Sequence, residues 1–202
     1  MGLARVIAVV AAALAGRAEI IDRVAVRVGR SVITESELRR EIRLTAFLEG
    51  APLEFSATTQ RKTAERLVDQ RLIRAEMEES RYPQPPPEAA EEALKQVLAE
   101  RSRASLDQYG ITEEELRAHL QRQLVTLRFI SVRFRPGVQI EPGEIDQYLA
   151  RHKSANGTPP PEEHRARIEE ALIEERVNRL AEVWLKEARA RTRIEFRPEV
   201  FQ

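Results

Sequence analysis

Apolar residues in this chain recur at the spacing of an α-helix over most of its length, and this periodicity limits the fold more than any other feature. The longest such stretches are residues 56–80, 112–134 and 162–191, in which apolar side chains return every three or four positions. Each stretch would form a helix with one apolar face, and that face must be buried against another element. A chain of 202 residues has room for one full domain, or one domain with extensions. We therefore expect a mainly α-helical protein.

Capping residues, glycine and proline indicate where the helices begin and end. Residues 34–37 (TESE) and 112–115 (TEEE) both have the spacing of a capping box, so we expect a helix to start at each. Gly50 can end the first of these helices. Further helices are predicted over residues 88–105 and, in a shorter form, after Pro142.

Two short segments near the ends of the chain alternate apolar and polar residues, as β-strands do. Residues 23–28 carry valine at every second position, and Gly29-Arg30 suits a type II′ turn into residues 31–34. A hairpin alone is only marginally stable. Residues 192–196 alternate again and are predicted to add a third strand. The predicted fold class is therefore mainly α, an irregular helical domain with a small β element made of the N-terminal hairpin and the C-terminal strand.

The first residues have the layout of a secretory signal peptide. Arg5 provides a positive charge, residues 6–14 form an unbroken apolar run, and the small residues Ala13 and Ala15 suit a signal peptidase. The run is well short of the roughly 20 residues that span a bilayer, so no stable membrane insertion is expected after cleavage. We predict a signal peptide over residues 1–18, export of the mature chain, and a location in the periplasm.

Composition and missing motifs exclude several kinds of function. Lys+Arg and Asp+Glu both number 33, so no net charge draws the chain to nucleic acid, and no nucleic-acid partner is expected. The chain has no cysteine, which excludes disulfides and thiol nucleophiles. It contains no glycine-rich nucleotide loop and no pair of histidines at metal-ligand spacing. We therefore expect no cofactor, no metal and no catalytic residues, and His119 is predicted to lie at the surface or boundary of its helix.

Large apolar residues gather near one loop and at the ends of several expected helices. One interpretation is that most of them fill the core. The other is that some line an open groove for extended apolar segments of other polypeptides, because each methylene buried there would contribute about 0.8 kcal/mol. The candidates for such client binding are Phe47, Leu48, Leu53, Phe55, Phe129, Phe134 and Tyr148.

Five segments, taken in order, resemble the SurA-type periplasmic chaperones. They are IIDRVAVRV at 20–28 with VITESEL at 32–38, LVDQRLIRAEM at 67–77, YGITEEELR at 109–117, IEPGEIDQY at 140–148, and VWLK at 183–186 with IEF at 194–196. The resemblance covers nearly the whole mature chain. Each motif alone has little specificity, but all five in the right order are fairly specific.

The chain departs from that family at one place. In the family a parvulin-type prolyl isomerase domain follows the segment that corresponds to residues 144–148. Here residues 153–161 (KSANGTPPP) look like a linker and lead directly into the last helix, and no glycine-rich parvulin core is present. The resemblance therefore implies the chaperone module without the enzyme. Residues 19–152 and 162–202 would together complete one domain around that linker.

The function that this resemblance implies is that of an ATP-independent holdase for unfolded outer-membrane or secreted proteins. A non-catalytic periplasmic adaptor or assembly subunit with one folded partner is the main alternative, and a prolyl isomerase is a second one. A swapped homodimer, in which the last helix docks on a neighbouring copy, also stays open.

Overall fold

The computed structural model describes residues 22–151 and 162–202. The predicted signal peptide, residues 1–18, and the predicted linker, residues 153–161, lie outside the described residues. Within the described ranges, no helix combines the length and the apolar character that crossing a membrane requires.

The described part of the chain is mainly helical and carries one small sheet, which confirms the predicted fold class. Its strands are β1 (Val24–Val28), β2 (Ser31–Thr34) and β3 (Ile194–Phe196). Its α-helices are α1 (Glu35–Glu49), α2 (Ala57–Glu79), α3 (Pro87–Glu100), α4 (Ala104–Tyr109), α5 (Glu113–Phe134), α6 (Pro142–Arg151) and α7 (Glu162–Arg191). Short 3₁₀ turns follow at η1 (Arg135–Gly137) and η2 (Pro198–Val200).

The sheet joins the two ends of the described chain. Its strand order is β2-β1-β3 with antiparallel pairing throughout, and Val26 at its centre pairs with both Ile33 and Phe196. Gly29 takes a left-handed φ of 57° while Arg30 does not, so φ is positive only at the first turn position, as a type II′ turn requires. The predicted third strand is present.

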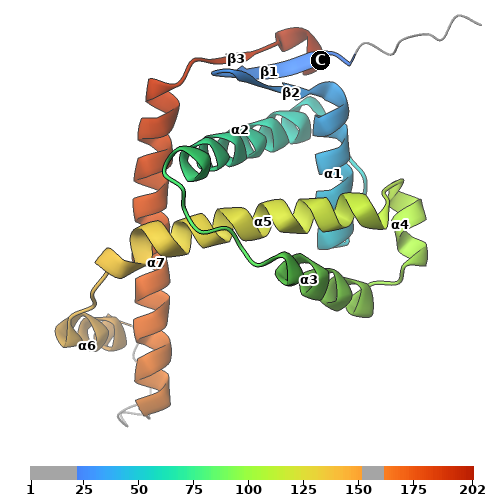
Figure 1. The fold of residues 1–202 in the computed structure, drawn as a ribbon. Helices are drawn as coiled ribbons and strands as arrows, with labels where there is room; N and C mark the ends of the chain where they lie inside the picture. The colour runs from blue at the N-terminus through green and yellow to red at the C-terminus, as the bar shows by residue number, and fades with distance from the viewer. Residues whose placement is uncertain (1–21, 152–161) are drawn as a thin grey trace, which may run out of the picture.

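Four helices form a frame below the sheet (Figure 1). α1 and α7 stand at opposite ends, and α2 and α5 run across between them, with α2 directly under the sheet. α3 packs against α5 on the side away from the sheet, and α4 contacts α1. α6 lies beside the N-terminal half of α7, and together these two segments extend past α5.

Only one of the two predicted capping boxes is complete. The Thr112 hydroxyl accepts from the Glu115 N–H at 3.1 Å, and the Glu115 carboxylate accepts from the Thr112 N–H at 2.9 Å. At the start of α1, Thr34 accepts from the Glu37 N–H, but the Glu37 side chain does not return to it. That carboxylate instead pairs with Arg71 on α2 at 2.6 Å, because a charged partner is a stronger attraction than one backbone N–H.

The helix predicted over residues 88–105 ends early, and this prediction was wrong at its C-terminal end. Arg101 takes an extended conformation after α3, and its guanidinium donates to the Leu48 carbonyl at 2.6 Å. The chain then turns into α4, which the sequence analysis did not predict. This turn lets Tyr109 pack edge-on against the Phe47 ring of α1, with ring centroids 5.7 Å apart. A tertiary contact thus overrides the local helical pattern.

The core consists of two apolar clusters. The larger one lies between the sheet, α1, α2, α5 and α7, and it contains Phe129 and Trp184 with ring centroids 4.8 Å apart. The smaller one lies among α1, α3, α4 and α5 around Phe47. α7 is also fastened to α2, because Arg189 donates to Asp69 at 2.7 Å and to the Glu65 carbonyl at 2.9 Å. The last helix therefore packs among the N-terminal helices.

We expect Phe129→Ala to lower the free energy of unfolding by about 3–5 kcal/mol, because it opens a cavity beside a fully buried aromatic contact. Trp184 is the only tryptophan of the chain, so its fluorescence emission in a urea titration reports on this contact. Val183→Ala removes a side chain that is 53% exposed on the same helix, and it should change stability by about 0.5 kcal/mol or less. If Phe129→Ala and Val183→Ala lowered the free energy of unfolding equally, the burial of Phe129 against Trp184 would be contradicted.

Candidate functional site

Two of the seven predicted client-binding residues are interior residues. Phe47 is 1% exposed and Phe129 is 0% exposed, and each belongs to one of the two core clusters. Their rings are covered by other side chains and offer no surface to a client. This corrects the prediction for these two positions: helical spacing placed them near helix ends, but the neighbouring helices close over them.

The other five residues do not come together into one groove. Leu53 is 39% exposed in the loop before α2, and Leu48 packs beside the smaller cluster. Phe55 and Phe134 pack at the edge of the larger cluster, whereas Tyr148 lies on α6. Phe134 forms an edge-on ring contact with Phe129 at 5.8 Å, whereas Phe47 contacts the ring of Tyr109. The predicted site is therefore distributed over several elements.

An open hollow of about 300 Å³ lies beside Trp184, between α2 and α7. We call it the Trp184 hollow; it is lined by Leu72, Ala75, Glu76, Glu79, Trp184, Ala188, Arg191 and Thr192. Trp184 also lies near the ring of Phe134, with centroids 6.5 Å apart. The guanidinium of Arg133 lies 5.6 Å from the Trp184 ring and bonds to Glu76 at 3.1 Å, so it borders the same region.

The sequence analysis did not single out the Trp184 hollow. It placed Trp184 on the apolar face of the last helix, which is correct, since the residue is 7% exposed. Two further apolar residues of α7 remain uncovered, Leu180 at 41% and Val183 at 53% exposure. A broad apolar face in the sequence was the available signal, but the pattern cannot show which part of that face another helix covers.

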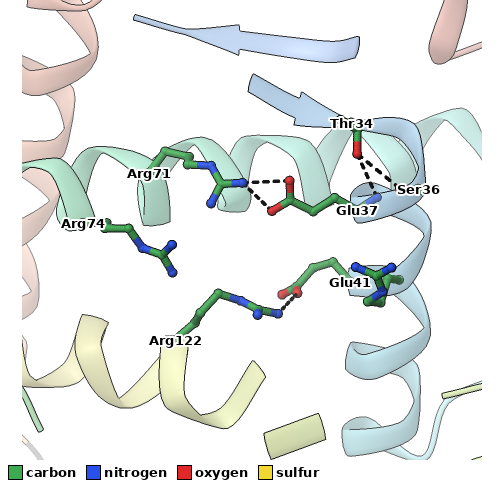
Figure 2. A pocket seen from close by; sticks show the side chains of 8 residues that line it. Thr34, Ser36, Glu37, Glu41, Arg71, Arg74 and Arg122 are labelled. Carbon is green, nitrogen blue, oxygen red and sulfur yellow. Dashed lines mark hydrogen bonds and ion pairs between the residues drawn. The ribbon is translucent and has the colours of Figure 1, made fainter. Parts of the chain in front are cut away.

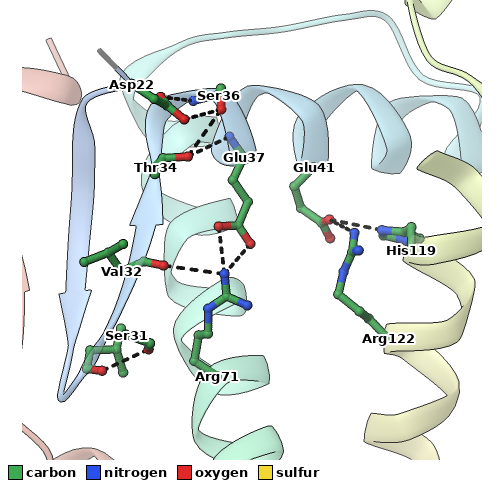
Figure 3. Close-up of polar contacts among 11 residues, drawn as sticks. Asp22, Ser31, Val32, Thr34, Ser36, Glu37, Glu41, Arg71, His119 and Arg122 are labelled. Atoms are coloured by element: carbon green, nitrogen blue, oxygen red, sulfur yellow. Dashed lines mark hydrogen bonds and ion pairs between the residues drawn. The ribbon is translucent and has the colours of Figure 1, made fainter. Parts of the chain in front are cut away.

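A pair of ionisable side chains is buried between α1 and α5. Glu41 and His119 are each 2% exposed, and His119 Nδ1 lies 3.1 Å from a Glu41 carboxylate oxygen (Figure 3). Because an ionised carboxylate only accepts hydrogen bonds, Nδ1 carries the hydrogen in this contact. The prediction that His119 lies at the surface or boundary was wrong: α1 covers the side of α5 that a lone helical pattern leaves open.

The pKa of the Glu41 carboxyl is lowered from its ordinary value. Burial by itself would raise this pKa, because it disfavours the charged form. The hydrogen bond with His119 and the electrostatic attraction to it act in the opposite direction and outweigh burial. Arg122, whose guanidinium lies 3.4 Å from Glu41, and Arg66 add to the lowering.

A second pocket, of about 360 Å³, opens next to Glu41 among α1, α2 and α5 (Figure 2). We call it the arginine pocket; it is lined by Thr34, Ser36, Glu37, Arg40, Glu41, Arg71, Arg74 and Arg122. Arg71 is held by both oxygens of Glu37 at 2.6 and 2.8 Å. Arg74 is exposed and has no hydrogen bond or ion pair within the described part of the chain. The arrangement can therefore hold an anion.

The described residues contain no group of three or more His, Asp or Glu side chains that could hold a metal ion. Comparison of the chain with known protein families and with curated proteins finds no match. The functional argument therefore rests on the geometry of these sites and on the sequence, and the resemblance to SurA-type chaperones stays a prediction.

We expect Glu41→Gln to lower the free energy of unfolding by about 1–3 kcal/mol near pH 7, because it removes a charged, hydrogen-bonded partner from the interior. The folded-state pKa of Glu41 is lowered, so the stabilisation from its ionised form is present above the ordinary carboxyl pKa and is lost as the pH falls through the folded value. The difference in the free energy of unfolding between Glu41→Gln and the wild type should therefore shrink below about pH 4. Urea titrations followed by circular dichroism at several pH values measure it.

Glu54→Gln is the matched control for this experiment, because Glu54 is exposed in the loop before α2. It should change stability by about 0.5 kcal/mol or less at every pH. A Glu41→Gln difference that stays constant from neutral to acid pH would show that ionised Glu41 does not stabilise the fold.

Proposed function

We propose that this chain is an ATP-independent periplasmic chaperone, a non-enzymatic holdase that binds unfolded outer-membrane or secreted proteins at the Trp184 hollow. The observation that carries this proposal is the open hollow beside Trp184, with Leu180 uncovered at 41% exposure about one helical turn earlier on the same helix. The resemblance of five sequence segments to SurA-type chaperones supports the same function, and the predicted signal peptide supports the location.

Four of the residues that line the Trp184 hollow are apolar and four are polar or charged, so it can take an apolar client side chain with polar groups beside it. Leu72 and Ala75 of α2 face Trp184 and Ala188 of α7 across it. Leu180 precedes Trp184 by about one helical turn, so it continues the apolar surface along α7. Leu72, Trp184 and Ala188 are at most 9% exposed, so a client side chain would contact only the edges of these groups.

The expected affinity is low, and low affinity suits a holdase. Burying one apolar side chain contributes about 1.5–3 kcal/mol, and part of this is offset by the freedom that the client loses. A client would therefore bind through several such side chains and dissociate readily. Release by mass action needs no nucleotide, and the sequence carries no glycine-rich nucleotide loop.

α6 and the N-terminal half of α7 form an arm that lies beyond the crossing of α5 and α7, on the side away from the sheet (Figure 1). Arg176 of α7 pairs with Glu144 of α6 at 2.6 Å, and Ile145 and Ile168 are buried at 7% and 6% exposure. The arm extends the surface past α5, and a long unfolded client could follow it. This shape supports binding of an extended chain more than binding of a small molecule.

The second candidate function is an adaptor with one folded partner. The arginine pocket favours it, because charged groups fixed in position recognise a defined surface better than they recognise varied unfolded chains. Pull-down from periplasm separates the two functions. Many unfolded clients support the holdase, and one stoichiometric partner supports the adaptor.

The proposal predicts that the purified chain suppresses light scattering from a chemically denatured client at several-fold molar excess. The double variant Leu180→Asp/Val183→Asp should lose most of this effect, because it places one charge at Leu180, a helical turn from Trp184, and a second at Val183, one turn from Leu180 on the uncovered side of α7. Both residues are exposed, so the fold should be kept, and circular dichroism checks this.

Leu53→Asp is the matched control, because Leu53 is about as exposed as Leu180 but precedes the opposite end of α2. It should suppress scattering as well as the wild type does. If the wild type has no effect on scattering, the holdase proposal is refuted. If only Leu53→Asp loses activity, the client surface lies at the loop before α2 instead.

A further inference from the structure

We propose that the arginine pocket is a second binding site, and that it takes the carboxylate of an acidic side chain in an extended polypeptide segment. This inference goes beyond the proposed function, because it concerns a charged ligand group and a different face of α2. Arg71 and Arg74 turn toward the arginine pocket, whereas Leu72 and Glu76 of the same helix line the Trp184 hollow.

Three elements bring cations to the arginine pocket. Arg40 comes from α1, Arg71 and Arg74 from α2, and Arg122 from α5. Figure 2 shows the α2 and α5 arginines and the carboxylates of α1 extending toward the same space. The guanidinium fork matches a carboxylate in two parallel hydrogen bonds, so a cluster of arginines favours this ligand group.

Three of the four arginines are paired with carboxylates before any ligand binds, and one of these is Arg122, which lies 3.4 Å from Glu41. Glu37 holds Arg71, which also lies 3.5 Å from the Val32 carbonyl (Figure 3). Glu115 holds Arg40 at 2.7 Å. Arg74 is different, because its guanidinium is exposed and makes no hydrogen bond or ion pair with any described residue. It is therefore the arginine most available to a ligand.

Glu41 provides an independent indication that a ligand completes this site. It lines the arginine pocket at 2% exposure, and its Oε1 atom is buried without a hydrogen-bond partner. The Nε of Arg122 is also buried without a partner. A buried acceptor left unpaired is unfavourable. Both atoms are covered in the unbound structure, so a ligand N–H pairs with Glu41 when the side chains around it move, while a ligand oxygen binds the exposed Arg74.

A polypeptide meets both requirements at once. An Asp or Glu side chain supplies the carboxylate, and the adjoining backbone supplies an N–H. A volume of about 360 Å³ accommodates one such side chain with its backbone, and it lies at the lower end of the range for ligand pockets. An inorganic oxyanion offers the same oxygens but no backbone N–H, so it is the alternative that the experiment must separate.

The test uses the full mature chain labelled with ¹⁵N and two short peptides that are acetylated and amidated at their ends. The peptides are identical except that one carries a central Glu and the other a central Gln. In low-salt buffer, the Glu peptide should shift the Nε–H signals of Arg71, Arg74 and Arg122, and it should bind about tenfold or more tightly than the Gln peptide. Equal binding of the two peptides would refute the site.

Arg74→Gln should abolish most of the preference for the Glu peptide, whereas Arg128→Gln should leave it unchanged. Both arginines are exposed, and neither pairs with another described residue, so the two variants are matched in chemistry and in their small effect on folding. If Arg74→Gln and Arg128→Gln have the same preference for the Glu peptide over the Gln peptide, the carboxylate does not bind in the arginine pocket.

Inorganic phosphate is the third arm of the test. If phosphate shifts the same signals and binds as tightly as the Glu peptide, the pocket is a site for simple oxyanions and the polypeptide proposal is wrong. The outcome is independent of the holdase experiment. Leu180→Asp/Val183→Asp leaves the arginine pocket intact, so binding of the Glu peptide should survive in that variant even when suppression of scattering is lost.

Discussion

Where α7 crosses α5, the indole of Trp184 lies against the ring of Phe129 with centroids 4.8 Å apart, and the rest of the fold depends on this contact. α2 and α5 can bury their apolar faces only if a further helix closes the side that α1 leaves open. α7 does so, and the ion pairs of Arg189 with α2 fix its angle of approach. Because the same helix continues past this crossing, one end of it belongs to the core and the other supports α6.

Two kinds of surface result from this frame, on two faces of α2. Toward α7, the junction combines apolar contacts with the ion pairs of Arg189, and it is incompletely filled, which leaves the Trp184 hollow. Toward α1 and α5, the junction is ionic, and buried Glu41 separates the arginine pocket from a smaller hollow of about 200 Å³. A buried charge of this kind is kept only when partners compensate for its loss of water, and here His119 and Arg122 do so. An apolar ligand and a charged one could therefore be bound without competing.

The sequence predicted the features that depend on local interactions. The capping box at Thr112, the helix end at Gly50 and the hairpin turn at Gly29 involve neighbours within a few residues, and all three are present. The features that it missed depend on partners far along the chain. Glu37 binds Arg71 instead of closing its own cap, and His119 is buried by a helix that begins some eighty residues earlier. Periodicity defines the apolar face of a helix but not what covers the other faces.

The same limit applies to the candidate site. Phe47 and Leu53 lie close together in the sequence, yet one is at the centre of a cluster and the other is exposed. No composition or spacing rule distinguishes them, because the difference arises from α4 folding back onto α1. Trp184 is the opposite case: its burial could be predicted, but the open edge beside it exists only where two helices from distant parts of the chain meet.

The central strand β1 is bordered on one side by β2, which follows it directly, and on the other by β3, which is nearly the last segment of the chain. Until β3 arrives, β1 exposes a row of free N–H and C=O groups along that edge. β3 follows β1 by more than 160 residues, so during synthesis the sheet is complete only after all the described α-helices have been made. Pairing between segments so far apart in the sequence slows folding, and the edge of β1 stays open to pairing with other chains until β3 is added.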